Sequence, residues 1–244
     1  MTTIVLKLGG SLITEKERAE TLDDASLSAA ADAVADCEDR LALVHGAGSF
    51  GHHYAERHGV SVSEGTTDAG AALEIHGSMT TLNRFVLSRL HDRDVPALPV
   101  HPLSAGAREA DATLDMPIPA VRTMLEEGFV PVSHGDVLAH EGCGATVVSG
   151  DEVVVRFAAG LDADRVGLCS TVDGVYDAEG DVIDHIDDFD AVADALGESD
   201  ATDVTGGMAG KVRTLLDLEA PAYVFGAADL ETFLAGGEPG TRID

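Results

Sequence analysis

The segment IVLKLGGS (residues 4–11) decides the fold of this chain. Its apolar run ends in two glycines and a serine, which predicts a buried strand over residues 4–8 followed by a tight turn. A second segment of the same kind, LALVHG (residues 41–46), comes after an Ala-rich stretch of helical period at residues 22–37. Strands that alternate with helices in this way predict a mainly parallel sheet with helices on both faces.

The alternation continues along the chain and predicts an α/β fold, a three-layer αβα sandwich around a mainly parallel central sheet. No Ser/Pro-rich linker and no internal repeat interrupts it, so we expect a single domain over residues 1–244. The other predicted strands are residues 95–100, 129–134, 164–170 and, as the last strand, 222–226; the predicted helices are residues 69–93, 119–127, a helix opening at Asp151, and 205–220; the predicted hairpins are residues 104–118 and 136–150.

The charge of the chain is strongly negative, with 44 acidic against 15 basic residues and a formal net charge of -29. Nucleic acid backbones and anionic membranes attract Lys and Arg, so we expect neither as a partner. No segment approaches the roughly 18 apolar residues of a membrane helix. The N-terminus does not resemble a signal peptide. Three widely spaced cysteines fit free thiols in a reducing compartment, so we expect a cytoplasmic protein.

Lysine is rare, and the three lysines, Lys7, Lys16 and Lys211, lie near glycine-bearing turns. In an open parallel sheet, ligands bind beyond the carboxyl ends of the strands. Glycines there let backbone N–H groups approach an anion, and a helix N-terminus adds partial positive charge. The pattern therefore predicts a phosphate-binding site. The turns are Gly9-Gly10-Ser11, Gly46 to Gly51, Ser149-Gly150-Asp151 and Gly206-Gly207.

Two common nucleotide-binding motifs do not explain these turns. A Walker A loop is absent, because the segment from Gly206 to Lys211 lacks the required spacing and the Ser or Thr. GAGSFG (residues 46–51) has the spacing of a dinucleotide fingerprint. It follows the second predicted strand, however, and no acidic residue ends a strand about 20 residues later, where that fingerprint requires one. We therefore disfavour NAD binding.

Five segments, KLGGS, HGAGSFGHH, SGD, VDGVY and TGGMAGK, occur in an order that resembles the amino acid kinase superfamily over essentially the whole chain. Within it, GSFGH and the closing GTRID are most similar to the archaeal isopentenyl phosphate kinases. The resemblance implies direct in-line transfer of the γ-phosphate of ATP, bound with Mg²⁺, to isopentenyl phosphate, which gives isopentenyl diphosphate. It also implies a homodimer, with the acceptor bound by residues of about 1–150 and the nucleotide by residues of about 151–244.

The resemblance further implies catalytic roles. Lys7 and Lys211 would contact the transferring phosphate from opposite sides, Asp151 would orient them, and Lys16 would stabilise the transferring charge. Asp151 could instead be a helix N-cap, and Lys16 could be a solvated residue between two glutamates. The scarcity of lysine favours the functional interpretation of Lys16. The implied ATP-binding residues are Lys7, Gly9, Gly10, Ser11, Gly48, Thr171, Gly207 and Lys211.

Two positions depart from the family pattern. The usual Gly-Gly-Gly of the second turn is Gly46-Ala47-Gly48 here, which the backbone tolerates if φ of Ala47 stays negative. Thr171 stands where the family has an Asp, which affects contacts to the nucleotide and not the fold.

His52 indicates the nature of the acceptor. The second pKa of a phosphate monoester is about 6, so at neutral pH it is mostly a dianion that needs no base. It needs relief from repulsion by ATP, which a histidine can give by donating a hydrogen bond. We expect Ala47, Gly51 and Gly150 beside His52 in the acceptor site. His53 and His58 are predicted to be surface residues, and His45 is predicted to be structural. The candidates for the apolar tail site are Ala72, Ile75, His76 and Met79. Apolar residues at this helical spacing are, however, more often part of the core.

Two other functions remain open from the sequence. A sibling kinase would act on a small carboxylate or phosphonate, against which the GSFGH segment weighs. A nucleotide-binding protein without catalysis would have no reason to keep all three lysines together with Asp151. No His, Cys or Asp cluster has metal-ligand spacing, so the implied Mg²⁺ would be carried by ATP.

The acidic, lysine-poor surface predicts dependence of stability on salt. At molar salt, screening acts over about 3 Å, which removes the self-repulsion of the folded chain. We expect the melting temperature to fall when KCl is lowered from about 3 M to about 0.1 M, where the screening length is about 10 Å. Calorimetry at the two concentrations measures this, and an unchanged melting temperature would contradict it.

Overall fold

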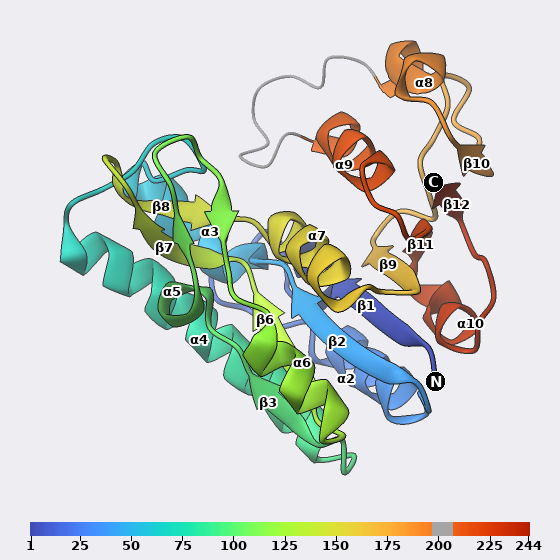
Figure 1. The fold of residues 1–244 in the computed structure, drawn as a ribbon, viewed down its shortest axis with the longest axis horizontal. Coiled ribbons are helices and arrows are strands. Elements are labelled where there is room, and N and C mark those ends of the chain that lie inside the picture. The colour runs from blue at the N-terminus through green and yellow to red at the C-terminus, as the bar shows by residue number, and fades with distance from the viewer. Residues whose placement is uncertain (197–206) are drawn as a thin grey trace.

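The computed structural model describes residues 1–196 and 207–244, arranged around two β-sheets (Figure 1). The strands are β1 (Thr3–Leu8), β2 (Arg40–His45), β3 (Ala97–Pro99), β4 (Ala107–Arg108), β5 (Leu114–Asp115), β6 (Val130–His134), β7 (Asp136–His140), β8 (Gly144–Val148), β9 (Arg165–Ser170), β10 (His185–Ile186), β11 (Ala222–Gly226) and β12 (Thr241–Ile243). The helices are α1 (Gly10–Ile13), α2 (Asp24–Ala35), α3 (Gly48–His58), α4 (Ala69–His91), α5 (Pro102–Ala105), α6 (Pro119–Glu126), α7 (Gly150–Leu161), α8 (Phe189–Leu196), α9 (Gly207–Leu216), the 3-10 turn η1 (Ala227–Asp229) and α10 (Leu230–Leu234).

The larger sheet has eight strands in the order β10-β12-β11-β9-β1-β2-β6-β3. Its pairs are parallel except for β11 and β12, which are antiparallel. Strand β1, which contains the apolar run of residues 4–8, lies between β9 and β2 near the centre. The mainly parallel central sheet predicted from the sequence is therefore confirmed.

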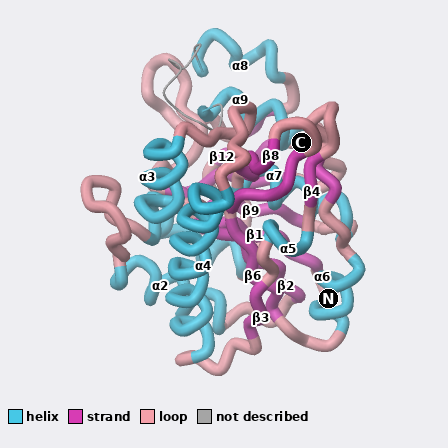
Figure 2. Tube along the Cα trace, turned by 90° about the vertical axis from the view of Figure 1, so that its left-hand side faces the viewer, coloured by secondary structure: helices cyan, strands magenta, loops and turns pink. Residues whose placement is uncertain are grey.

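Helices cover both faces of this sheet, as the alternation of side chains along β1 requires. Ile4 and Leu6 point to one face and pack in a cluster with residues of α2 and α4, whereas Val5 packs in the opposite cluster with Phe157 of α7. In Figure 2, α2, α3 and α4 lie on one side of the strands and α6 on the other. The three-layer αβα arrangement is thus confirmed.

The smaller sheet, in the order β5-β4-β7-β8, contains both predicted hairpins. β4 pairs with β5 and β7 with β8, both antiparallel. The buried side chain of Arg108 on β4 joins this sheet to the first turn of α7, because its Nη2 lies 2.8 Å from Glu152 Oε1. The smaller sheet is thereby fixed to a helix of the central sandwich.

Three expectations need correction. Residues 48–58 form helix α3, although the glycines there predicted only a turn. β11 is not the last strand, because Thr241–Ile243 pairs with it as β12. The last predicted helix is described over Gly207–Leu216, and its first two predicted residues lie outside the described part of the chain. Among the described residues, no helix is both long and apolar enough to cross a bilayer.

Candidate active site

A cavity of about 370 Å³ opens at the carboxyl ends of the central strands. Residues that end or directly follow β1, β2, β6 and β9 line it, together with residues of α3, α7 and α9. This is the edge at which ligands bind in open parallel sheets. It is also the edge at which the glycine-bearing turns were expected.

Lys7 and Asp151 form an ion pair inside the cavity. Lys7 shares a face of β1 with Val5, which directs its side chain toward α7. Its Nζ lies 2.7 Å from Asp151 Oδ1, and the two side chains are only 12% and 18% exposed. A Cβ at Gly150 would lie 3.2 Å from Lys7 Cε, so a larger residue there would crowd the lysine. The turn before α7 therefore holds the ammonium group against the carboxylate.

The cap of helix α7 corrects one alternative for Asp151. Ser149 is the N-cap, its hydroxyl accepts a hydrogen bond from the Glu152 amide, and the Glu152 carboxylate accepts one from the Ser149 amide. Asp151 is therefore not the cap. Its carboxylate is left to pair with Lys7.

The other two lysines and His52 reach the same cavity from different elements. Lys16 lies in the exposed turn after α1, Lys211 lies half-buried on α9, and His52 lies on the exposed side of α3. With Lys7, all three lysines of the sequence line this one space. In a chain of net charge -29, the cavity is thus a site that an anion can occupy.

The glycine turns bring helix N-termini to the cavity. A Cβ at Gly10 would lie 2.2 Å from the Gly48 nitrogen, and one at Gly46 would lie 2.5 Å from the Gly10 nitrogen, so the two turns touch through their backbones. Ala47, which lies between Gly46 and Gly48, has a φ of -75°, the negative value that was expected for it. Helices α1, α3 and α7 begin at these turns, so the partial positive charge of their N-termini lies at the cavity and attracts anions.

Part of the cavity lining is an apolar cluster. Ile75 and Met79 of α4, Ala55 of α3 and Val147 of β8 line this part. Of the candidates for an apolar tail site, Ile75 and Met79 are thus placed in the wall, whereas Ala72 and His76 are not among the lining residues.

The predicted site residues gather at this cavity, with one exception. Gly207, at the buried start of α9, does not line it. The roles assigned to the lining residues stay predictions. Those predicted residues are Lys7, Gly9, Gly10, Ser11, Lys16, Ala47, Gly48, Gly51, His52, Gly150, Asp151, Thr171 and Lys211.

Some lining residues were not predicted from the sequence. Asp136 and Gly135 follow β6 in the same way that Gly46 and Ala47 follow β2. The repeated His-Gly pair at the two strand ends, residues 45–46 and 134–135, is the signal that could have found them. Met208 on α9 also lines the cavity, and no sequence pattern indicates it.

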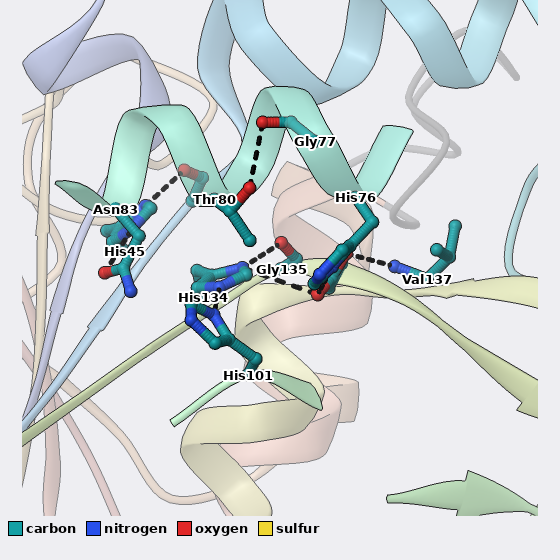
Figure 3. A network of polar contacts seen from close by, with 11 residues as sticks. His45, His76, Gly77, Thr80, Asn83, His101, His134, Gly135 and Val137 are labelled. Atoms are coloured by element: carbon teal, nitrogen blue, oxygen red, sulfur yellow. Dashed lines mark hydrogen bonds and ion pairs between the residues drawn. The ribbon is translucent and has the colours of Figure 1, made fainter. Parts of the chain in front are cut away.

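A network of histidines lies behind the cavity wall (Figure 3). His45 and His134 have ring centroids 5.3 Å apart and are stacked, and His101 Nδ1 lies 2.9 Å from His134 Nε2. His76 on α4 donates from Nδ1 to Asp136 Oδ2 at 2.8 Å. The Asp136 side chain is fully buried and lies at the junction of this network with the cavity.

Burial decides the charge of these rings. It lowers the pKa of His45 to about 4 and holds the pKa of His134 well below its usual value. Burial also lowers the pKa of His101, whereas the hydrogen bond to Asp136 raises the pKa of His76. At neutral pH the stacked pair is therefore uncharged.

This geometry is that of a phosphotransferase, because lysines and helix N-termini surround one cavity at the edge of a parallel sheet. A model of the amino acid kinase family matches residues 2–220. The isopentenyl phosphate kinase of Haloferax volcanii is 61% identical over 100% of this chain and 99% of its own length, and that of Methanothermobacter thermautotrophicus is 35% identical over 98% of both. An X-ray structure of an isopentenyl phosphate kinase is 30% identical with a TM-score of 0.86, covering 99% of this chain and 100% of that one.

The chain belongs to the amino acid kinase family. The resemblance drawn from the short motifs is confirmed, as is the fold class.

The buried histidines predict acid sensitivity. The folded-state pKa of His45, about 4, lies below the unfolded value of 6.5, so between these values the unfolded chain binds more protons. The contribution of this ring to stability is present above pH 6.5 and is lost as the pH falls toward 4. From pH 7 to pH 5 this amounts to roughly 2 kcal/mol of unfolding free energy for His45 alone.

Urea unfolding in concentrated KCl at pH 7 and pH 5 measures the loss. A His45→Asn variant, which cannot take up the proton, should show a smaller difference between the two pH values. An equal difference in both proteins would contradict the assignment to His45.

Proposed function

We propose that this protein transfers the γ-phosphate of ATP to isopentenyl phosphate, forming isopentenyl diphosphate and ADP. The observation that carries the proposal is the convergence of all three lysines and His52 on one cavity whose lining includes an apolar cluster. The similarity to isopentenyl phosphate kinases over the full chain supports this acceptor over other phosphate esters. Kinases of this family use ATP as the donor.

The nucleotide would occupy the side of the cavity formed by the later part of the chain. Lys211 of α9 and Thr171 after β9 lie there. The Gly9-Gly10-Ser11 turn would donate backbone N–H groups to the phosphates. Mg²⁺ fits as a companion of ATP, because Mg²⁺ is commonly held through substrate phosphates. In the described residues no group of three or more His, Cys, Asp and Glu side chains could hold a metal ion by itself.

The acceptor would occupy the other side, formed by α3, α4 and the turn before α7. His52 would donate a hydrogen bond to its phosphate, with backbone groups of Ala47, Gly51 and Gly150 around it. The five-carbon tail would lie against Ile75 and Met79. An apolar wall is suited to an alkenyl chain and unsuited to a second carboxylate, which disfavours a carboxylate kinase of the same family.

The transfer step needs alignment and positive charge more than proton chemistry. A phosphate oxygen of the acceptor forms a bond to the γ-phosphorus, while the bond from that phosphorus to the β–γ bridging oxygen breaks and ADP leaves with the electron pair. Lys7 and Lys211 would neutralise the transferring oxygens, with Lys7 held in place by Asp151. Lys16, in its exposed turn, would reach charge that develops on the transferring group.

The cellular setting is part of the proposal. All three cysteines are free thiols in the structure, which agrees with a reducing cytoplasm. The acidic composition and the identity to the Haloferax volcanii kinase support a salt-adapted protein. A homodimer rests on the family resemblance alone.

Turnover tests the function directly. In concentrated KCl with ATP and Mg²⁺, we expect ADP release that depends on isopentenyl phosphate and is lost in a Lys211→Ala variant, because one of the two charges at the transferring phosphate is missing. A coupled assay of ADP measures this. Release of ADP with acetylglutamate but not with isopentenyl phosphate would contradict the proposal, and ATP binding without transfer to any acceptor would indicate a non-catalytic protein.

Alanine variants of two neighbouring residues, His52 and His53, test the role of His52. His52→Ala should raise KM for isopentenyl phosphate by roughly tenfold to a hundredfold, the value of a hydrogen bond to a charged group, and leave KM for ATP nearly unchanged. His53→Ala is the matched control, because His53 is also an exposed α3 histidine but does not line the cavity. Equal losses for both substrates in His52→Ala would contradict an acceptor-specific role.

A further inference from the structure

His45 and His134 occupy equivalent places on adjacent strands. They end β2 and β6 and are register partners in the parallel pair. Both are 0% exposed. Each is followed by a glycine, Gly46 and Gly135, that lines the cavity, while neither imidazole lines it. The rings therefore lie outside the cavity lining, next to the glycines that form part of it. Figure 3 shows His134 beside Gly135.

Each ring makes the same hydrogen bond. His45 Nδ1 lies 3.1 Å from the Gly46 carbonyl oxygen, and His134 Nδ1 lies 2.8 Å from the Gly135 carbonyl oxygen. A carbonyl oxygen only accepts, so the proton of each neutral ring is on Nδ1. Each Nε2 is then an acceptor, and His134 Nε2 receives the Nδ1–H of His101 at 2.9 Å.

Asn83 completes this arrangement for His45. His45 Nε2 lies 3.2 Å from Asn83 Oδ1, while the buried Asn83 Nδ2 has no hydrogen-bond partner among the described residues. Carboxamide oxygen and nitrogen are told apart by their hydrogen bonds. With the His45 proton on Nδ1, rotation of the amide by half a turn lets Nδ2–H donate to Nε2. The surroundings of His45 therefore accommodate the Nδ1 proton that the Gly46 carbonyl requires.

These bonds fix the orientation of two peptide groups. In a planar trans peptide the C=O and the following N–H point in opposite directions. Holding the Gly46 oxygen on the ring of His45 therefore directs the Ala47 N–H away from that ring, which lies behind the wall. For His134 the fixed peptide joins Gly135 to Asp136. The Gly135 amide also donates to the His45 carbonyl at 3.1 Å, so the two turns are held to each other.

Glycine makes such a restraint necessary. Because glycine adopts many backbone conformations, a Gly-containing turn left to itself can rotate its peptides. Two fully buried imidazoles are an expensive way to fill core volume, since each must find partners for both ring nitrogens. An aliphatic side chain would fill the same space without that requirement. The bonds to the glycine carbonyls are what an aliphatic residue could not supply.

We propose that His45 and His134 are positioning residues that lock the Gly46–Ala47 and Gly135–Asp136 peptides at the acceptor end of the cavity. This rests on the proposed function, in which the Ala47 amide faces the acceptor phosphate. Neither ring touches substrate, and each acts through the glycine that follows it.

The kinetic test compares two substitutions at one position. His45→Asn keeps an N–H near the place of Nδ1, whereas His45→Leu keeps volume and removes the donor. We expect His45→Leu to raise KM for isopentenyl phosphate at least tenfold with KM for ATP changed less than twofold. In His45→Asn both KM values, for isopentenyl phosphate and for ATP, should stay within about threefold of the wild-type values, because the hydrogen bond to the Gly46 carbonyl is retained.

His140 provides the matched control. It is a buried histidine that hydrogen-bonds Thr146 Oγ1 at 3.1 Å, and it does not line the cavity or bond a glycine carbonyl. His140→Leu should leave the ratio of the two KM values unchanged. If His45→Leu and His45→Asn behave alike, or if His140→Leu changes the ratio equally, the positioning role is wrong.

A second measurement does not depend on activity. Nitrogen-15 chemical shifts of the imidazoles in concentrated KCl report the tautomer of each ring. We expect His45 and His134 to be neutral and protonated on Nδ1 from pH 8 to pH 6. Their titratable neighbours His101 and His76 are followed in the same spectra, and Asp136 is followed by the carbon-13 shift of its carboxyl group. An Nε2–H tautomer at either ring would overturn the proposal even if the enzyme turns over isopentenyl phosphate. If the wild type has both Nδ1–H tautomers but does not turn over isopentenyl phosphate, the result counts against the proposed function alone.

Discussion

The repulsion between two phosphate groups is the constraint on which this structure depends. Two unit charges 4 Å apart cost about 4 kcal/mol in the intermediate dielectric of a protein surface. A chain of net charge -29 adds a long-range field that repels both substrates. The response is local, because the three lysines and the N-termini of α1, α3 and α7 all face one cavity. Elsewhere the surface stays acidic without weakening the site.

The lysines can meet there only because the backbone makes room. Gly10 and Gly48 allow two strand-end turns to touch, and Gly150 leaves space for the side chain of Lys7. The parallel sheet then supplies the geometry, since β1 and β2 end at the same edge. A larger side chain at any of these glycines would push the turns apart without changing the charge of any residue. The close contact of the turns is therefore as much a part of the site as the ammonium groups.

Local signals in the sequence predicted the central strands and the glycine turns at the cavity, because apolar runs that end in glycine mark the carboxyl edge of a sheet. The roles of Lys16, Asp151 and Thr171 came from the family resemblance and not from these signals. Helix α3 was missed because Gly48 and Gly51, close to its start, are poor helix formers. The short strand β12 was missed because only its pairing with β11 defines it. The contact of Asp136 with His76 was missed because the two residues are 60 positions apart, although the repeated His-Gly pair marks the turn that contains Asp136.

The histidines of this region differ in burial, and burial determines whether the imidazole can be charged. His52, on the exposed side of α3, keeps contact with water and lines the cavity. His45 and His134, fully buried, are held neutral and can serve only as fixed donors and acceptors. A charged imidazole at His134 would donate from both nitrogens and lose the acceptor that His101 Nδ1–H needs.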